Sequence, residues 1–259
     1  MQLNFSKYQG TGNDFVIIDN RLNDFSKKNE LIRNLCDRHF GIGADGLMLL
    51  ESSNNADFYM RYYNSDGNES TMCGNGGRCI THFAHKIGLI QSSAHFYGID
   101  GEHFSNIEDC GLINLKMQDV KELKIDKDYY FLNTGSPHYV CFVSDVQKVD
   151  VDKEGRRIRN SFNLNNGGTN VNFVDLSQNK IHVRTFERGV EAETLACGTG
   201  SVASAITVCH HTKSDKREFK ITTQGGELTV KLNKVSNTEY NNIWLKGPAT
   251  HVFDGEITI

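Results

Sequence analysis

The residues of this sequence that are best suited to chemistry lie in two short turns, each a cysteine followed by glycines. The first turn falls within residues 64–78, NSDGNESTMCGNGGR, and places Cys73 directly before Gly74, Asn75 and two more glycines. An apolar segment with helical spacing follows, so the glycines leave the first helical N–H groups open. Such a helix start attracts an anion, and a thiol placed there has a lowered pKa. The pattern predicts a reactive thiol beside a site for a carboxylate-sized anion.

A second turn of the same kind, ACGTG, occupies residues 196–200 and contains Cys197, 124 residues after Cys73. Further landmarks recur at nearly the same separation: Thr11-Gly12 with Thr134-Gly135, Asn64 with Arg188, and Gly101-Glu102 with Gly226-Glu227. This register predicts a duplicated domain in which each copy carries one Cys-Gly-Xaa-Gly turn. Chance matching in a glycine-rich chain is the alternative, and the repetition of the rare cysteine argues against it.

The composition of the chain argues against several functional classes of protein. The 259 residues carry a net charge of −4, which argues against nucleic acid or an anionic membrane as the main partner. The N-terminal residues lack a signal-type apolar run, and no stretch approaches membrane-spanning length. Seven scattered cysteines are an odd number, so we expect thiols in a reducing cytoplasm rather than a disulfide framework.

Short alternating segments outnumber helical ones, which predicts an α+β fold. Strands are expected at residues 3–9, 15–19, 47–50, 58–63, 95–97 and 112–117, and again at 129–133, 139–143, 172–174, 181–186, 219–223 and 228–232. Helices are expected at residues 29–39 and 145–160 and after each cysteine turn. The prediction is two pseudo-symmetric duplicated α/β domains, each a curved sheet around its cysteine helix. The expected domains are residues 1–118 and 119–248, with a C-terminal strand in 249–259 returning to the first.

Residues 41–46, GIGADG, match the glycine pattern of dinucleotide-binding loops. That site requires a strand, then the glycine turn, then a helix. Here a predicted helix precedes the glycines and a predicted strand, LMLL, follows them. The order is reversed, so we interpret this segment as a tight helix-to-strand connection.

Several other interpretations of the cysteine turns are weaker. Zinc sites use paired ligands at short spacing, whereas Cys73 and Cys79 are separated by five residues and Cys197 has no cysteine near it before Cys209. Neither turn ends in the Gly-Lys-Ser/Thr of a phosphate loop. A purely structural helix start would not need cysteine twice, although buried free cysteines are common. No metal and no cofactor are predicted.

Two equivalent turns, one in each half, favour two thiols that face each other across an inter-domain cleft. One thiolate would remove a proton from a Cα atom, and the opposite thiol would return a proton to the other face. Both helix starts would hold the carboxylate and stabilise the charge that develops on it. This chemistry is racemisation or epimerisation of an amino acid without pyridoxal phosphate.

Seven blocks along nearly the whole chain resemble the diaminopimelate epimerase family. They are YQGTGNDFVIID, RHFGIGADG, YYNSDGNESTMCGNGGRC, NTGSPHYV, GTNVNFV, FERGVEAETLACGTG and GPATHVFDGEI. The resemblance implies cofactor-free conversion of LL- to meso-diaminopimelate on the route to lysine and peptidoglycan, in the cytoplasm. It also implies two barrel-like halves, each around a central helix, and a homodimer acting on a small-molecule substrate.

The resemblance also assigns site residues by position. Cys73 and Cys197 would be the acid/base thiols, and the reacting carboxylate would bind the backbone at Gly74, Asn75, Gly198 and Thr199. The distal amino acid end would be read by Asn13, Asn64, Asn170 and Arg188, with Glu187 near an amino group. His138 would lie close to the thiols, although a histidine satisfied in the core is an equal alternative. Two positions depart from the family pattern: Gly46 replaces a glutamine found in some members, and Ser136 replaces an asparagine often found before Pro-His.

Two other functions remain open. A proline or hydroxyproline racemase would use the same two cysteines but only one amino acid carboxylate pocket, and the polar set of Asn13, Asn64, Asn170 and Arg188 favours a larger substrate. A non-catalytic metabolite-binding or redox-sensing protein could also use paired cysteines. Substitution of either cysteine would separate that class from an enzyme.

Overall fold

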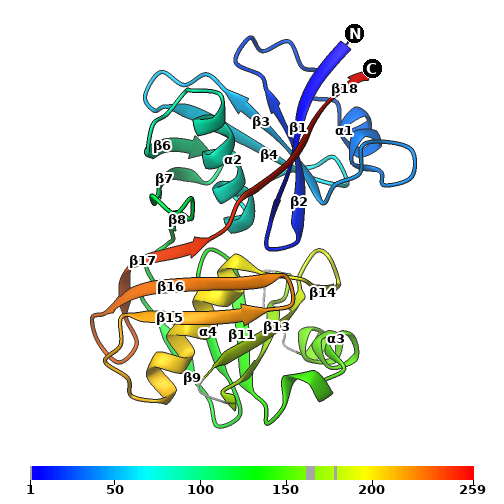
Figure 1. Cartoon of the computed structure of the whole chain (residues 1–259). Helices are drawn as coiled ribbons and strands as arrows, with labels where there is room; N and C mark the ends of the chain where they lie inside the picture. Colours follow the sequence, from blue (N-terminus) through cyan, green and yellow to red (C-terminus); the bar gives the residue numbers. More distant parts are fainter. Residues whose placement is uncertain (1, 162–166, 178–179) are drawn as a thin grey trace. The chain divides into compact units, whose positions relative to one another are not determined.

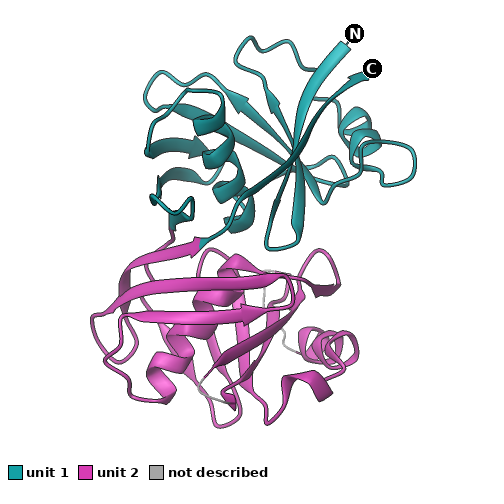
Figure 2. Ribbon diagram, viewed as in Figure 1, with its two compact units in different colours: residues 1–115, 247–259 teal, residues 116–246 magenta. Residues whose placement is uncertain are grey.

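The computed structural model describes residues 2–161, 167–177 and 180–259. The chain forms two compact units: unit 1 contains residues 1–115 and 247–259, and unit 2 contains residues 116–246 (Figure 2). Within the described residues, no helix has both the length and the apolar character needed to cross a membrane.

Unit 1 is a mixed sheet that starts at the C-terminal strand and continues from β1 to β8 (Figure 1). Its strands pair in the order β18–β1–β2–β3–β4–β6–β7–β8, and β5 pairs with β4. The bounds are β1 (Gln2–Gly10), β2 (Asn13–Asp19), β3 (Gly46–Glu51), β4 (Phe58–Asn64), β5 (Glu69–Ser70), β6 (Ser93–Gly98), β7 (Gly101–Ile107), β8 (Ile113–Lys116) and β18 (Thr250–Thr258). Its helices are α1 (Asn29–Cys36) and α2 (Gly74–Lys86).

Unit 2 repeats this plan. Its strands pair in the order β9–β10–β11–β12–β13–β15–β16–β17, and β14 pairs with β13. The bounds are β9 (Leu123–Ile125), β10 (Tyr130–Asn133), β11 (Pro137–Phe142), β12 (Asn170–Asp175), β13 (Ile181–Glu187), β14 (Ala192–Thr194), β15 (Glu218–Thr223), β16 (Gly226–Lys234) and β17 (Tyr240–Gly247). Its helices are η1 (Val146–Lys148), α3 (Val151–Ser161) and α4 (Gly198–His211).

The two sheets match pair by pair, including direction. In each unit the two parallel pairings occupy the same places, β2–β3 and β4–β6 in unit 1, β11–β12 and β13–β15 in unit 2. The cysteine-capped helix also follows the same short strand in each, β5 or β14. The predicted fold class, two duplicated α/β units, is therefore confirmed.

Each unit curves its sheet around one central helix. Helix α2 packs against β1, β2, β3, β7 and β18, and α4 packs against β10, β11, β12, β13, β15 and β16. Both helices are buried over most of their length, since strands contact them on several sides. A helix in this position holds its first residue in a fixed place relative to the sheet.

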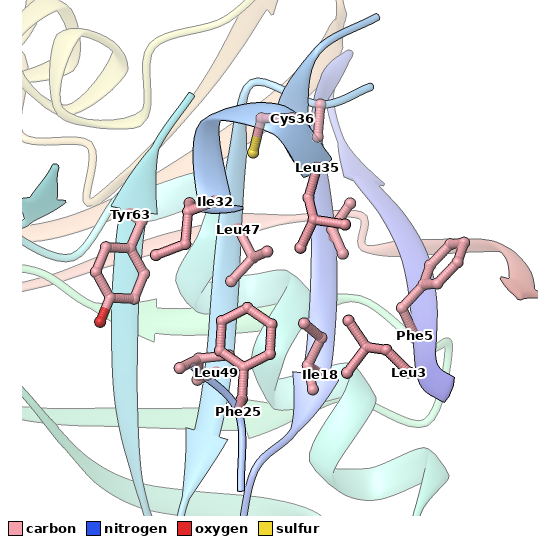
Figure 3. Packing of buried hydrophobic residues seen from close by; sticks show 12 residues of the cluster. Leu3, Phe5, Ile18, Phe25, Ile32, Leu35, Cys36, Leu47, Leu49 and Tyr63 are labelled. Atoms are coloured by element: carbon pink, nitrogen blue, oxygen red, sulfur yellow. The ribbon is translucent and has the colours of Figure 1, made fainter. Parts of the chain in front are cut away.

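The outer face of the unit 1 sheet is covered by α1 (Figure 3). Ile32 and Leu35 of α1 pack on strand residues such as Leu47, Leu49 and Ile18. Strand β3 is buried at all six positions because helices lie on both of its faces, so its sequence GLMLLE is almost continuously apolar. In unit 2, α3 packs against β12 and β13 in the equivalent place.

Several predicted elements differ in extent from those observed. The helix expected at residues 29–39 ends at Cys36, because Asp37 has extended backbone angles. The helix expected at 145–160 is two pieces, η1 and α3. The segment at 41–46 connects α1 to β3, which confirms the helix-to-strand interpretation. The C-terminal strand expected within 249–259 is β18, which spans Thr250–Thr258 and pairs with β1 of unit 1.

Candidate active site

Helix α2 begins with the cysteine that the sequence singles out. Cys73 is its N-cap residue, with extended backbone angles of φ −87° and ψ 131°. The first helical hydrogen bond runs from Gly77 N to Cys73 O at 2.7 Å. The N–H groups of Gly74, Asn75 and Gly76 therefore have no acceptor within the helix. These N–H groups and the helix dipole together favour an anion beside the sulfur.

Helix α4 begins in the same way. Cys197 is its N-cap residue, with φ −116° and ψ 116°, and Ser201 N donates to Cys197 O at 2.9 Å. Gly200 is required here, because a Cβ atom would come within 2.4 Å of Asn172 Oδ1. The close approach of α4 to β12 thus depends on glycine in the first turn.

Two asparagines surround the sulfur of Cys73 within unit 1. Cys73 Sγ lies 3.5 Å from Asn13 Oδ1, and Asn75 Nδ2 donates to the same oxygen at 3.4 Å. Asn13 Nδ2 donates to Asp45 Oδ2 at 2.7 Å. Asn13 follows the two-residue turn between β1 and β2, in which Thr11 and Gly12 both have positive φ. That hairpin turn sets Asn13 beside the start of α2.

A fully buried arginine lies one turn into α2. Arg78 Nη2 donates to Asn75 Oδ1 at 3.0 Å and to Thr11 Oγ1 at 3.2 Å. Its Nη1 donates to Gly74 O and its Nε to Pro248 O, each at 3.2 Å. Burial lowers the pKa of the Arg78 guanidinium, while the sulfurs of Cys79 and Cys73 act in the opposite direction. Arg78 joins the β1–β2 turn, the residues before β18 and the start of α2.

The sulfur of Cys197 has a different neighbour. Cys197 Sγ lies 3.4 Å from Thr199 Oγ1, and either atom can be the donor. The Thr199 carbonyl accepts a hydrogen bond from Thr134 Oγ1 at 2.9 Å, which ties the loop between β10 and β11 to α4. A hydroxyl can rotate to donate or accept, so this contact suits both a thiol and a thiolate.

His138 is a buried neutral histidine on β11. Asn172 Nδ2 lies 3.0 Å from its Nδ1, and Asn170 Nδ2 lies 3.4 Å from its Nε2. Burial, helped by the charge of Arg188, lowers the pKa of His138 to about 3, against the opposing hydrogen bond from Asn172. The imidazole is therefore uncharged at neutral pH.

The remaining predicted residues of unit 2 gather at the ends of β12 and β13. Asn170 Oδ1 accepts the backbone N–H of Arg188 at 2.8 Å. Ser136 Oγ accepts from Asn170 Nδ2 at 3.0 Å and from Arg188 Nη2 at 3.4 Å. Glu187 Oε2 accepts the hydroxyl of Thr194 at 2.9 Å. Asn170, Arg188, Ser136 and His138 thus belong to one polar group within unit 2, and the neighbouring Glu187 bonds Thr194 of β14.

Asn64 stands apart from the other predicted residues of unit 1. It is exposed, ends β4 opposite Gly46, and its N–H donates to Asn68 O at 3.0 Å. The next residue, Ser65, donates to Asp45 O at 3.1 Å, so Asn64 borders the segment that holds Asn13. Hydrogen bonds join Asn13, Asn75 and Cys73, whereas the described hydrogen bonds of Asn64 run to its own turn.

Comparison with known proteins supplies the family. Residues 5–111 and 130–252 match the family model for diaminopimelate epimerase. A protein of Flavobacterium psychrophilum with that name is 51% identical over 253 residues, which cover 97% of this chain and 98% of the relative. The chain belongs to the diaminopimelate epimerase family. A second member, from Chlorobaculum tepidum, is 41% identical over 96% of this chain and 99% of its own.

Solved structures of other families share the fold of this diaminopimelate epimerase family member. A phenazine biosynthesis protein of the PhzF family from Bacillus anthracis has a TM-score of 0.78 at 17% identity, covering 100% of both chains. A hydroxyproline epimerase from Agrobacterium vitis has a TM-score of 0.72 at 14% identity, covering 99% of this chain and 92% of that one. At such identities the likeness shows the fold alone.

The two departures from the family pattern have structural explanations. A Cβ atom at Gly46 would lie 2.5 Å from the Tyr62 ring and 2.6 Å from Tyr63 O, so this family member has no room for a side chain there. Ser136 contacts both Asn170 and Arg188, so the smaller side chain still reaches the polar group of unit 2.

Sequence reasoning missed two residues of these sites, Arg78 and Asp45. A charged residue near a helix start reads as part of a solvated face, and nothing local indicates that Arg78 is buried. Asp45 lies in the connection at residues 41–46, for which the sequence predicts only a turn. For Arg78 the repeat register gives a sequence signal, because the matching position in α4 is the apolar Val202, which is buried.

Proposed function

We propose that this chain converts LL-2,6-diaminopimelate to meso-diaminopimelate without a cofactor, using Cys73 and Cys197 as acid/base thiols. The observation that carries the proposal is the duplicated cysteine cap in a chain of this family. Each unit has one cysteine at the start of its central helix, before a glycine-containing first turn. Inversion at one carbon by two bases requires two such groups.

In the proposed reaction one sulfur is a thiolate and the other a thiol. The thiolate accepts the α-proton from one face, and the electron pair of the broken C–H bond is delocalised into the substrate carboxylate. The thiol then donates its proton to the opposite face, and the pair forms the new C–H bond. N–H groups at Gly74, Asn75, Gly198 and Thr199 hold the carboxylate and stabilise the added charge.

The distal amino acid end is assigned to Asn13, Asn64, Asn170 and Arg188, with Glu187 near an amino group. The contacts of Arg188 with Asn170 and Ser136 support this, because a positioned guanidinium binds a carboxylate in a defined direction. His138 is assigned a supporting role beside this group. Since it is neutral, it can donate or accept one hydrogen bond at each nitrogen but does not supply charge.

The proposal includes the biological setting implied by the resemblance. The product would enter lysine and peptidoglycan synthesis, and the enzyme would be a cytoplasmic homodimer acting on a small molecule. The net charge of −4 supports the absence of a nucleic-acid partner.

Isotope incorporation tests the reaction. Purified protein incubated with LL-diaminopimelate in deuterated water should give meso product with deuterium at the inverted α-carbon, because the donating thiol exchanges with solvent. Absence of label in diaminopimelate, together with turnover of proline, would support a proline racemase instead. Absence of turnover with every amino acid would favour the binding or sensing class.

Oxidation tests whether the two thiols approach each other. Diamide, a two-electron oxidant, should convert the two thiols to one disulfide with loss of two protons, and a reductant should restore activity. The thiol count of the seven-cysteine chain would fall from seven to five. A count of seven after treatment of the substrate-free protein would contradict the facing geometry.

A further inference from the structure

Arg78 is a buried cation whose described partners are all neutral. It is 0% exposed, and its acceptors are two backbone carbonyls, the Thr11 hydroxyl and the Asn75 amide oxygen. Among the residues that the structure describes, no carboxylate pairs with it. An uncompensated charge in a protein interior is costly, so its presence calls for an explanation beyond packing.

The second unit shows that the fold itself does not need this charge. Val202, which follows Cys197 by five residues as Arg78 follows Cys73, is equally buried in α4. There Thr134 joins the preceding loop to the helix directly, through its hydrogen bond to Thr199 O. In unit 1 the equivalent Thr11 bonds Gly10 O and, at 3.4 Å, the Asn75 side chain of α2, and Arg78 donates to both Thr11 and Asn75. The same helix therefore forms with an apolar residue in place of the arginine.

Arg78 also fixes the orientation of the amides around Cys73. A guanidinium only donates, so Asn75 must present Oδ1 to Arg78 and Nδ2 to Asn13. At the other end the Asp45 carboxylate only accepts, so Asn13 must present Nδ2 to Asp45. Both ends thus require Asn13 to direct its carbonyl oxygen at Cys73 Sγ.

We propose that Arg78 is a positioning residue whose buried charge makes Cys73 the thiol that ionises first, leaving Cys197 protonated in the free enzyme. This inference depends on the proposed two-thiol reaction, in which one sulfur must start as thiolate and the other as thiol. If the two sites were identical, neither sulfur would be favoured as the initial thiolate. The arginine in α2, which is replaced by valine in α4, favours ionisation of Cys73.

Other charged groups around Cys73 are engaged elsewhere. Asp100 accepts the backbone N–H of Met72 at 3.3 Å and pairs with His103 at 3.1 Å. Asp45 pairs with Arg38 at 2.7 Å. These carboxylates and the Asn13 carbonyl oppose a thiolate. The full charge of Arg78 acts through a protein interior that screens it weakly, so we expect it to outweigh them.

Two further groups, the Arg188 guanidinium and the Cys79 thiol, differ in burial from Arg78 and Cys73. Arg188 in unit 2 is partly exposed, so solvent screens it more than Arg78. Burial raises the pKa of Cys79, which follows Arg78, to about 12, so that thiol stays protonated despite the neighbouring cation. Cys73 is partly accessible and is therefore the sulfur on which the charge of Arg78 can act.

Site-resolved alkylation tests this inference. Iodoacetamide reacts with thiolates, so its rate at each cysteine, followed by peptide mass spectrometry from pH 5 to 10, gives a midpoint for Cys73 in Cys197→Ser protein and for Cys197 in Cys73→Ser protein. We expect the Cys73 midpoint about one unit or more below that of Cys197. Equal midpoints, or the reverse order, would overturn the proposal.

Two substitutions separate charge from shape. Arg78→Met should raise the Cys73 midpoint by about one to two units, lowering its alkylation at pH 7 about tenfold, while the Cys197 midpoint stays unchanged. Arg78→Lys keeps the charge and should hold the Cys73 midpoint within about half a unit of the original. Equal shifts in both variants would indicate packing alone and would contradict the proposal, as would no shift in Arg78→Met.

The readout does not require catalysis. If Arg78→Met fails to fold, the midpoint order in the parent protein and the Arg78→Lys profile still decide the question. If the parent shows no deuterium incorporation but the midpoints differ as expected, the proposed reaction fails while the ordering of the thiols stands. Deuterium incorporation with equal midpoints gives the opposite result.

Discussion

The starts of α2 and α4 have the same backbone but different polar surroundings. Each cysteine caps its helix with extended backbone angles and accepts the first helical hydrogen bond on its carbonyl. Around Cys73 lie amides oriented by Arg78 and Asp45, whereas Cys197 contacts a hydroxyl that can rotate. Duplication has thus preserved the scaffold that places each sulfur, and the side chains around each sulfur have diverged.

The largest effect should be nearly equal at the two helix starts, because the proposed inversion needs both sulfurs. Cys73→Ser and Cys197→Ser should each lower kcat for diaminopimelate epimerisation by about 10²- to 10⁴-fold. Steady-state kinetics with a thermal unfolding control measures this. Cys110→Ser, at an exposed cysteine outside both sites, should change little. Normal activity in either site variant would remove its thiol from the mechanism.

The second prediction concerns stability and should distinguish the two helix starts. Asn75→Ala should lower the free energy of unfolding by about 2–3 kcal/mol, because Arg78 loses an acceptor in a buried place. The equivalent Thr199→Ala should cost about 0.5 kcal/mol, since Thr199 is partly exposed and its carbonyl still accepts from Thr134. Urea unfolding of both variants, with hydrogen exchange in α2 and α4, measures the difference. An equal loss of unfolding free energy in the two variants would mean that Arg78 does not depend on Asn75 as a hydrogen-bond acceptor.

The third prediction uses the buried histidine of unit 2, whose place in unit 1 is taken by Phe15. The unfolded chain's imidazole titrates near 6.5, whereas the pKa of His138 is about 3 in the fold. Above pH 6.5 the imidazole is neutral in both the folded and the unfolded chain, so its contribution to the free energy of unfolding is fully present. As pH falls from 6.5 towards 3, only the unfolded state binds the proton, so stability falls.

By pH 5 this loss should reach about 2 kcal/mol relative to pH 7. His138→Gln should flatten that part of the stability curve, because glutamine does not titrate. Urea midpoints measured at intervals between pH 7 and 5 test it, with the exposed His39→Gln as control. An unchanged slope in His138→Gln would show that this imidazole is not held neutral.

The elements of the fold whose signals lie in adjacent residues of the sequence could be predicted. Both cysteine helices were predicted because glycines and apolar spacing follow each cysteine directly. Strand β17 was missed, because Asn241 and Asn242 interrupt its alternation and Asn242 has a positive φ of 49°. The pairing of β18 with β1 joins Gln2 to Thr258, a contact between residues that no local pattern connects.

The residues of the candidate site also fall into those that the sequence predicts and those that only the folded chain reveals. The two cysteines were predicted from residue type and repeat position, whereas the asparagine set was predicted only from the family resemblance. The burial of Arg78 and the directed chain from Arg78 through Asn75 and Asn13 to Asp45 could not be found. That chain joins residues from α2, β2 and the connection before β3, and it exists only after the strands have paired.

The smallest expected effect compares Asn13 with its repeat counterpart Ser136. Ser136 contacts Asn170 and Arg188 but not the described neighbours of Cys197, so Ser136→Ala should raise KM about three- to tenfold and leave kcat nearly unchanged. Asn13→Ala should lower kcat as well, because Asn13 touches the sulfur of Cys73. Ser136→Asn, the residue often found in the family, should keep KM close to that of the parent. A fall in kcat for Ser136→Ala equal to that for Asn13→Ala would mean that the two units present these residues to the reacting carbon alike.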